Sequence, residues 1–408
     1  MKASEIREAI EIQAQDRGRH LGMPRDALPG VVCEDGFATI VTGVRRSGKS
    51  TLLNQWAEAR KERVVSVHFD DLRLSAFATS DFTILDAVVR EMGADTLVLD
   101  EVQDIPAWER YVAGNHDAGR RVLVTGSNAT LLSREFGTKL TGRHLNVELQ
   151  PFSYAEFLRF TGQGPSPETL SEYLAVGGFP AHVKTRRREV LSELFADVIY
   201  RDIVVRYRLR DPAPVRSLAA YLLGHVGSRV SPSRLKDAMH VRSAGTSLEY
   251  FAYLAETDLV RRLPRFASSP KARLAHPKKI YACDTGLVSA IARADGADFG
   301  HKLENLVFLK LLSPDATLSY YVDPVGDAEC DFLVERRDGS FSAVQVAWSL
   351  TPDNEEREFA GAVRAMERFG LKEATLVTHA QRDLVNLGGR LLHVIPAHEF
   401  LLKTQPVP

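Results

Sequence analysis

Apolar residues follow two spacings in the first part of this chain, one typical of strands and one typical of helices. From Phe37 to about Leu149, short apolar runs rich in β-branched residues alternate with longer stretches whose apolar residues recur at helical spacing. The strand-like runs are FATIVTG, VVSVHFDD, TLVLDE, RRVLVTGSN and HLNVEL, and the helical stretches are STLLNQWAEARK and ILDAVVREM. This alternation predicts an α/β fold with a mostly parallel sheet and helices on both faces.

The pattern changes near residue 160 and again near residue 295. Residues 152 to about 210 have helical spacing, and residues 213 to about 285 combine helices with the strand-like runs VRRLPRF and KKIYACD in an order that resembles a winged helix-turn-helix. The remaining residues predict a small α/β domain. We therefore expect four parts, at residues 1–160, 161–212, 213–290 and 291–408.

Composition excludes several classes of protein. The 408 residues are 44% hydrophobic and 26% charged, which is typical of a globular protein of two or three domains. No run approaches the roughly 20 apolar residues of a membrane helix, and the first residues lack the apolar core of a signal peptide, so we expect a cytoplasmic protein without a membrane partner. Three scattered cysteines predict neither disulfides nor a zinc site. The net charge of −1 means that any affinity for nucleic acid must come from local patches.

One glycine-rich segment predicts a phosphate site. The residues from Gly43 to Ser50 fit G-x-x-x-x-G-K-S/T at every required position, between a predicted strand and a predicted helix. Backbone N–H groups of such a loop surround phosphate oxygens, Lys49 neutralises phosphate charge, and the Ser50 hydroxyl can ligate Mg²⁺. The residues expected to contact ATP are Gly43, Arg45, Arg46, Ser47, Gly48, Lys49, Ser50 and Thr51.

Two acidic residues end a predicted strand fifty residues later. Asp100 can hold Mg²⁺ through water, and Glu101 can polarise a water molecule for attack on the γ-phosphate. Alone, such a pair is typical of a helix cap or a solvated turn. With a phosphate loop in the same sheet it favours hydrolysis, because ligands bind at the carboxyl ends of parallel strands and a nucleotide kinase needs no water-activating acid.

Three further polar positions are candidates for the same site. Asn128 follows the next strand and could align the attacking water or sense the γ-phosphate, and a turn formed by Ser127-Asn128 is the alternative. Arg143, and more weakly Arg134, could act as an arginine finger on a neighbouring subunit's γ-phosphate. A surface ion pair is the alternative for Arg143.

The motifs together resemble a known family. GVRRSGKSTLL, LVLDEVQDIPAWE, VTGSN, LTGR and LQPFSYAEF are similar to the bacterial and archaeal family of predicted AAA+ superfamily ATPases with an uncharacterised C-terminal region. The similarity continues through YLAVGGFPAHV, YRDIV, YACDTGL, LENLVFLKLL and ECDFLV, so it covers nearly the whole chain. It implies a P-loop ATPase core, a winged-helix region and a C-terminal domain related to restriction-endonuclease-like nucleases. Gln103 and Trp108 follow the acidic pair as the family's pattern expects.

The nuclease-like end departs from an active pattern. Asp331 and Glu304 could supply carboxylates, but the following strand has Gln345 in place of a metal-binding Glu and Ala347 in place of the lysine that assists water. A neutral amide binds Mg²⁺ poorly and a methyl group transfers no proton. We therefore expect that this domain does not cut DNA.

A basic run predicts a nucleic-acid contact. Between residues 260 and 279 there is no acidic residue, and the run contains Arg261, Arg262, Arg265, Lys271, Arg273, Lys278 and Lys279. On a wing these side chains would meet DNA phosphates. The helix TSLEYFAYLAETD lacks the residues that read base edges, so binding would depend on shape or charge, or the winged helix binds protein instead.

The leading hypothesis is a Mg-dependent ATPase that assembles into a homo-oligomer such as a ring and couples ATP turnover to DNA binding or remodelling. The alternative is a nucleotide-dependent switch or scaffold that acts through protein contacts without DNA. Stimulation of ATP turnover by DNA distinguishes the two.

Overall fold

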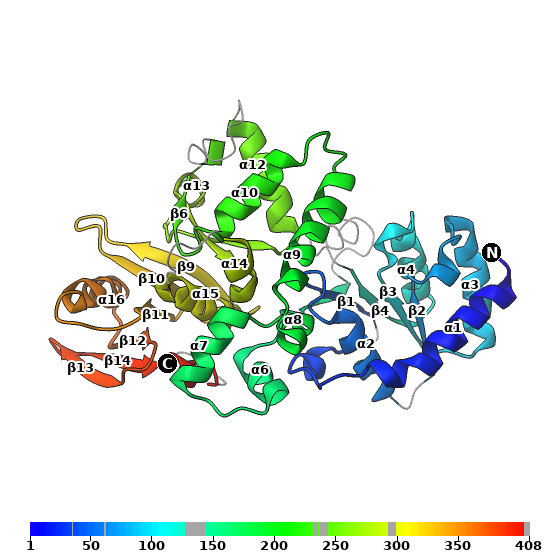
Figure 1. Ribbon diagram of the computed structural model, residues 1–408, viewed down its shortest axis with the longest axis horizontal. Helices are drawn as coiled ribbons and strands as arrows, with labels where there is room; N and C mark the ends of the chain where they lie inside the picture. The colour runs from blue at the N-terminus through cyan, green and yellow to red at the C-terminus, as the bar shows by residue number, and fades with distance from the viewer. Residues whose placement is uncertain are drawn as a thin grey trace. The chain divides into compact units, whose positions relative to one another are not determined.

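The structure is a computed structural model that describes residues 1–34, 36–60, 63–126, 143–231, 235–236, 244–292 and 299–403 (Figure 1). The chain forms two compact units. The first contains Met1–Pro151 with Glu256–Asp258, and the second contains Phe152–Ala255 with Leu259–Pro408. None of the helices in these described ranges is long and apolar enough to span a membrane.

The first unit is built on a parallel sheet of strand order β2-β3-β4-β1-β5. The strands are β1 (Ala38–Thr42), β2 (Val64–His68), β3 (Thr96–Asp100), β4 (Arg121–Thr125) and β5 (His144–Glu148). All four neighbouring pairs are parallel, which confirms the predicted sheet. Every residue of β1 and β3 is buried, as expected for strands covered on both faces.

Helices cover both faces of this sheet. They are α1 (Ala3–Arg17), α2 (Lys49–Glu58), α3 (Phe82–Glu91) and α4 (Trp108–Asp117). Leu52 and Trp56 of α2 pack with Val41 on one face, whereas buried residues of α1, α3 and α4 share a core cluster with β2 on the other. The sequence analysis did not predict α1, because this mostly polar helix buries only Ile6, Ala9 and Ile10.

The second unit begins with the predicted helical region. It comprises α6 (Tyr154–Thr161), α7 (Pro167–Val176), α8 (Pro180–Thr185), α9 (Arg188–Asp197), the π-helix η6 (Val198–Val205) and α10 (Ala213–Leu223). An antiparallel sheet of order β6-β8-β7 follows. Its strands and neighbouring helices are β6 (Arg229–Val230), α12 (Ala244–Glu256), β7 (Val260–Pro264), α13 (Pro270–Ala275), β8 (Lys278–Ala282) and α14 (Thr285–Ile291).

A six-stranded mixed sheet of order β13-β14-β12-β11-β10-β9 completes the second unit (Figure 1). Its elements are α15 (Phe299–Leu311), β9 (Ala316–Val322), β10 (Glu329–Arg336), β11 (Phe341–Val346), α16 (Glu355–Phe369), β12 (Glu373–Thr378), β13 (Asp383–Leu387), β14 (Arg390–Pro396) and α17 (Ala397–Phe400). The predicted small α/β region is confirmed. The finer division of the chain into four parts stays a prediction.

Residues from three separate sequence segments are in contact within the second unit. The backbone N–H of Phe152 donates to the carbonyl of Gly178 over 2.7 Å, and the N–H of Gly178 donates to Asp284 Oδ2 over 2.6 Å. A Cβ atom at Gly286 would lie 2.0 Å from the carbonyl oxygen of Val176. These contacts hold Phe152, Gly178 and Asp284 together, and the close approach to Val176 explains the glycine at position 286.

Candidate functional site

The glycine-rich loop lies between β1 and α2, as predicted. Gly43 and Gly48 have φ angles of 141° and 100°, which disfavour any residue with a side chain. A Cβ atom at Gly43 would also lie 2.1 Å from the carbonyl oxygen of Leu149. The loop ends where α2 begins, so backbone N–H groups of the first helical turn face the same space. This is the geometry that a phosphate requires.

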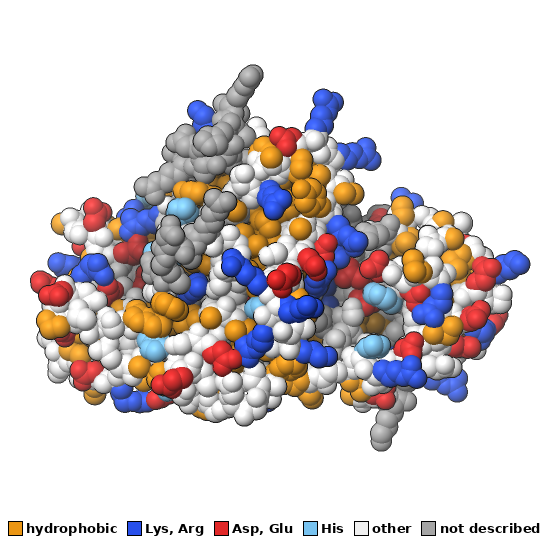
Figure 2. Space-filling view, viewed as in Figure 1, with side chains coloured by type: hydrophobic (Ala, Val, Ile, Leu, Met, Phe, Trp, Pro, Cys, Tyr) orange, Lys and Arg blue, Asp and Glu red, His pale blue; other side chains and the backbone are white. Residues whose placement is uncertain are grey.

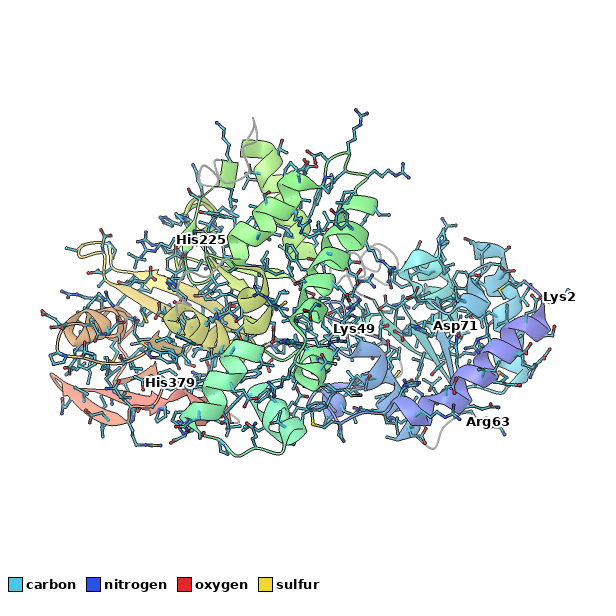
Figure 3. All side chains as sticks on the ribbon, in the orientation of Figure 1. Lys2, Lys49, Arg63, Asp71, His225 and His379 are labelled. Atoms are coloured by element: carbon cyan, nitrogen blue, oxygen red, sulfur yellow. The ribbon has the colours of Figure 1, made fainter. Side chains whose placement is uncertain are left out.

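Lys49 and Ser47 carry the polar groups of the loop. Lys49, labelled in Figure 3, is 4% exposed, and its Nζ donates to the carbonyl oxygens of Gly43 at 3.0 Å and Val44 at 3.3 Å. Ser47 Oγ is buried without a hydrogen-bond partner among the residues that the structure describes. The loop thus offers an ammonium group and a free hydroxyl to an incoming anion. Of the other predicted contacts, Arg45 and Arg46 lie in the loop and Thr51 lies in the first turn of α2.

A buried arginine that the sequence analysis missed braces the loop. Arg25 is 5% exposed, and its guanidinium donates to the carbonyl oxygens of Ser47 and Gln150, each over 2.7 Å. Its backbone N–H donates to Gln55 Oε1 in α2 over 3.2 Å. Arg25 therefore ties the loop to α2 and to the chain that leaves β5. Nothing in the local sequence distinguishes this arginine from an exposed one.

Asp100 lies at the carboxyl end of β3 and meets Ser50. The carboxylate is 7% exposed, accepts a hydrogen bond from the hydroxyl group of Thr125 and lines a cavity together with Ser50. His68 Nδ1 lies 3.0 Å from Asp100 Oδ2. Burial alone would raise the pKa of Asp100, but the neighbouring His68 and the hydroxyl groups of Thr125 and Ser50 hold that pKa below its ordinary value. The two predicted metal ligands are therefore adjacent, and Asp100 is ionised.

His68 and Thr125 are further members of the site that sequence reasoning did not single out. The strand register pairs His68 directly with Asp100. The carboxylate of Asp100 beside Nδ1 raises the pKa of His68, although burial opposes the shift. Both residues are the last of their strands, β2 and β4. A polar residue at the carboxyl end of each predicted strand was the available signal.

Glu101 has an unusual backbone and a polar neighbour. Its φ of 55° lies in the left-handed region, which is uncommon for residues other than glycine. Its N–H donates to Thr125 Oγ1 over 3.3 Å, and Glu101 Oε2 accepts a hydrogen bond of 2.6 Å from the side-chain amide of Gln103 in the 3₁₀ turn η5 (Val102–Asp104). Trp108, in contrast, is a core residue that is 2% exposed.

These residues fit ATP and Mg²⁺. A cavity of about 380 Å³ is lined by Ser50 and Thr51 at the start of α2 and by His68 and Asp100, with Gln13 of α1 on its wall. Within the described ranges no group of three or more His, Cys, Asp or Glu side chains could hold a metal ion. Mg²⁺ needs no such cage, because one or two protein oxygens suffice when phosphate and water supply the rest.

Of the remaining predicted residues, only Arg143 can be placed, because Asn128 and Arg134 fall outside the described residues. Arg143 precedes β5, and its Nη1 lies 3.3 Å from Asp117 Oδ1, with both side chains exposed. Because β5 runs parallel to β1 and pairs from Ala38 onward, Arg143 lies at the amino edge of the sheet, opposite the loop that follows β1.

The basic run of the second unit is only partly exposed. Arg262, Lys271 and Arg273 are exposed. Arg261 and Arg265 are half-buried, and Arg265 donates to the carbonyl of Val322. Lys278 Nζ donates to the carbonyl oxygens of Arg273, Leu274 and His276 at the end of α13. On the face shown in Figure 2, basic side chains are interspersed with acidic ones.

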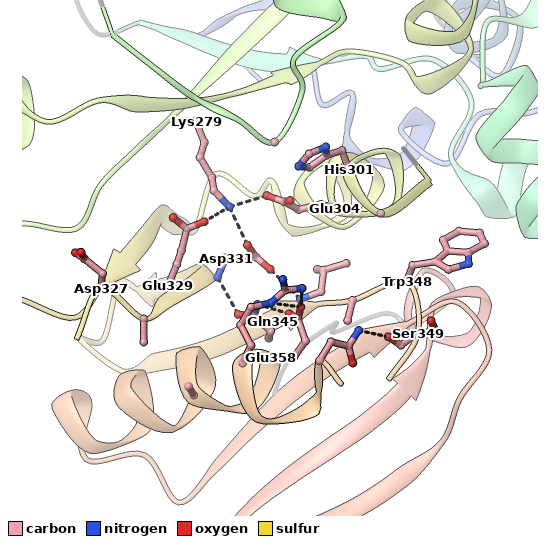
Figure 4. A pocket seen from close by; sticks show the side chains of 18 of the residues that line it. Lys279, His301, Glu304, Asp327, Glu329, Asp331, Gln345, Trp348, Ser349 and Glu358 are labelled. Atoms are coloured by element: carbon pink, nitrogen blue, oxygen red, sulfur yellow. Dashed lines mark hydrogen bonds and ion pairs between the residues drawn. The ribbon is translucent and has the colours of Figure 1, made fainter. Parts of the chain in front are cut away.

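Lys279 does not belong to the accessible basic surface. It is 3% exposed, and Nζ is bound by the carboxylates of Glu304, Glu329 and Asp331 at the wall of a cavity of about 710 Å³ (Figure 4). The expectation that it meets DNA phosphate is therefore wrong. The physical reason is strand alternation, which turns Lys278 outward and Lys279 toward the larger sheet.

Gln345 and Ala347 replace the Glu and the Lys that an active nuclease needs, and both side chains have structural contacts. Gln345 Oε1 accepts the N–H of Asp331 over 3.2 Å, and its Nε2 donates to Glu358 Oε2 over 3.1 Å. Ala347 is buried in a core cluster with Phe359 and Met366. Gln345 thus has a role in hydrogen bonding, and Ala347 has a role in core packing.

Comparisons with known proteins match the first unit to an AAA domain. A family model described as an AAA domain matches residues 35–158, and a domain of unknown function matches residues 167–298. The chain is 27% identical to an uncharacterised protein of Haemophilus influenzae over 343 residues, which are 79% of this chain and 85% of that protein. It is also 27% identical to an uncharacterised protein of Methanocaldococcus jannaschii over 361 residues, covering 83% and 80% of the two chains.

Solved structures include partial matches to two ATP-related proteins. The Walker-type ATPase of Pyrococcus abyssi is 14% identical, with a TM-score of 0.43, and the match covers 67% of this chain and 99% of that one. The replication initiator DnaA bound to AMPPCP and single-stranded DNA is 17% identical, with a TM-score of 0.29, and the match covers 58% and 86%.

Proposed function

We propose that this chain binds ATP with Mg²⁺ in its first unit and hydrolyses the γ-phosphate bond. The observation that carries the proposal is that Ser50, in the first turn of α2, and Asp100, at the end of β3, line the same cavity next to a glycine-rich loop that fits phosphate. The match of residues 35–158 to an AAA domain supports the same function.

Each polar group of the site has a role in this proposal. Lys49 exchanges its two loop carbonyls for β- and γ-phosphate oxygens, which the N–H groups of the loop also bind. Ser50 and Asp100 hold Mg²⁺, directly or through water, and the bound ion supplies charge neutralisation to the phosphates. Glu101 accepts a proton from the attacking water, and Asn128 orients that water.

We also propose that the protein works as a homo-oligomer such as a ring. Arg143 lies at the sheet edge opposite its own phosphate loop, so it could serve a γ-phosphate only in a neighbouring subunit. Its present partner is an exposed carboxylate, and such an ion pair costs little to exchange.

The second unit is proposed to bind DNA as a winged helix. The order of α10, β6, α12, β7 and β8 and the antiparallel order β6-β8-β7 support a winged helix, and Arg262, Lys271 and Arg273 are exposed to meet phosphates. Lys279 is buried and Lys278 contacts backbone carbonyl oxygens, so fewer basic side chains of this region can reach DNA phosphates. This observation favours the alternative function, a nucleotide-dependent switch or scaffold that acts on protein.

Phosphate release with saturating ATP and Mg²⁺ tests this proposal. Wild type and Lys184→Ala, which changes an exposed lysine of the second unit, are expected to turn over ATP equally, whereas Lys49→Ala is expected to lose turnover. Adding single-stranded and duplex DNA then separates the two candidates. Stimulation supports the DNA-coupled ATPase, and no stimulation by any form supports the switch. Turnover that is absent in the wild type, or equal in Lys49→Ala, contradicts the ATPase.

A further inference from the structure

The cavity at the six-stranded sheet contains a buried ion cluster built from three elements (Figure 4). Lys279 reaches it from β8, Glu304 from α15, and Glu329 and Asp331 from β10. Lys279 Nζ lies 2.8 Å from Glu304 Oε1, 2.6 Å from Glu329 Oε1 and 2.8 Å from Asp331 Oδ1. Three carboxylates thus converge on a single point.

The ammonium group is saturated by these contacts. It has three N–H donors and no acceptor, and each donor has one carboxylate within hydrogen-bond distance. Burial opposes charge on Lys279, but the carboxylates of Asp331 and Glu304 hold its pKa well above the ordinary value. Lys279 is therefore charged and occupies the point on which the three carboxylates converge. With Lys279 in this place, no group of three or more His, Cys, Asp or Glu side chains in the described residues could hold a metal ion.

The carboxylates also have partners that do not depend on Lys279. The hydroxyl of Tyr281 donates to Glu304 Oε1 over 2.6 Å, and the N–H of Val346 donates to Asp331 Oδ2 over 3.0 Å. Glu329 is paired with Arg229. These contacts hold the oxygens around the central point, so removal of the ammonium would leave a preorganised, negatively charged site.

We propose that Lys279 is the resident cation of this cavity and that it keeps a divalent metal ion out of the three-carboxylate site. In this arrangement the side chain of β8 supplies the charge that a metal would supply. The cavity then contributes no metal-bound water for hydrolysis, in line with Gln345 and Ala347 at the positions where an active nuclease needs a Glu and a Lys. The proposal concerns the second unit alone and does not depend on ATP hydrolysis.

The central prediction is that replacing Lys279 with methionine creates a metal site. Methionine keeps an unbranched apolar stem but leaves the buried carboxylates of Glu304 and Asp331 without their cation, which is strongly unfavourable unless another cation enters. Lys279→Met is therefore expected to gain one Mn²⁺ site per chain. Lys271→Met removes an exposed lysine of the same basic run and is the matched control.

A titration with Mn²⁺ at pH 8 in the absence of nucleotide, in which electron paramagnetic resonance measures the bound ion, tests the proposal. All proteins in this experiment carry Asp100→Asn, which eliminates the metal ligand of the first unit. The protein with Asp100→Asn alone, which keeps Lys279, is called the parent. Lys279→Met is expected to bind Mn²⁺ at least about tenfold more tightly than the Lys279 parent and the Lys271→Met control, and adding Asp331→Asn should remove the gain. Equal Mn²⁺ binding in folded Lys279→Met and the parent overturns the proposal. So does tight Mn²⁺ binding by the parent that Asp331→Asn abolishes.

A second measurement covers the case in which Lys279→Met does not fold. Acetylation of the parent protein, followed by mass spectrometry, should modify Lys279 at least about tenfold more slowly than Lys271, because a protonated, ion-paired amine is a poor nucleophile. Glu304→Gln with Asp331→Asn should accelerate the modification of Lys279 and leave Lys271 unchanged. Equal rates for the two lysines in the parent would overturn the proposal.

Discussion

The side-chain amide of Gln103 donates a hydrogen bond to Glu101 Oε2 over 2.6 Å. Glu101 is held at a φ of 55°, and Gln103 lies in the 3₁₀ turn that follows it. The other amide atom, Gln103 Oε1, is buried and has no hydrogen-bond partner in the described parts of the chain. Gln103 is therefore suited to orient the carboxylate that we propose to polarise water.

Loss of this amide should slow turnover without weakening nucleotide binding. Gln103→Ala frees the Glu101 carboxylate, so kcat is expected to fall by about tenfold or more while the Kd for ATP stays unchanged. Phosphate release and equilibrium binding of a fluorescent ATP analogue measure the two quantities. Gln163→Ala, at an exposed position, is the control. A raised Kd with unchanged kcat would show that Gln103 supports binding instead.

The Thr125 hydroxyl should contribute to stability through Asp100. Thr125→Val removes the donor to a buried carboxylate and the acceptor of the Glu101 N–H, so the free energy of unfolding should fall by roughly 1–3 kcal/mol. Thr96→Val is the matched control, because Thr96 Oγ1 in the neighbouring strand is buried without a partner within the described residues. Urea denaturation checks both variants. Equal losses in the two would rule out a special contribution from Thr125.

Arg25 is expected to support ATP affinity by shaping the loop. Arg25→Met leaves the carbonyl oxygens of Ser47 and Gln150 without this donor, at a cost of about 1–3 kcal/mol of folding free energy. The distorted loop should raise the Kd for ATP by about tenfold, because bound geometry depends on preorganised N–H groups. Calorimetric titration measures this change. Arg19→Met changes an exposed arginine and should leave the Kd unaltered.

The stability of the second unit should depend on pH through Glu304. Burial raises the pKa of Glu304 from 4.5 to about 7, with Lys279 opposing the shift. The folded protein therefore keeps a proton that the unfolded chain releases, so this stabilisation is complete below pH 4.5 and is lost as pH rises through 7. Relative to Glu304→Gln, the wild type should lose about 3 kcal/mol of unfolding free energy between pH 4.5 and 8. A difference that is constant with pH would contradict this.

The parts of the fold and site that could be predicted depend on local spacing. The loop from Gly43 to Lys49 has a fixed sequence signature, and β1 and β3 are short apolar runs that end at polar residues. Parallel strands bring their carboxyl ends to one edge, so the proximity of Ser50 and Asp100 follows from that pattern.

The parts that could not be predicted depend on contacts between distant segments. Arg25 reaches the phosphate loop because the chain folds back so that Arg25 can donate to the carbonyl of Gln150. His68 lies beside Asp100 because of the register of β2 with β3. Lys278 and Lys279 are adjacent and chemically identical, and only the packing of β8 decides which one is buried. The edge strand β13 was missed because its residues are mostly exposed.

Turnover and nucleotide affinity of Glu101→Gln, measured on the same samples with saturating Mg²⁺, test the central claim most directly. The substitution keeps the size of the side chain and removes the proton acceptor. We predict that the Kd for ATP stays within about twofold of the wild type and that kcat falls by about 10² or more. Wild-type turnover in Glu101→Gln, or the absence of ATP binding in both proteins, would contradict the account.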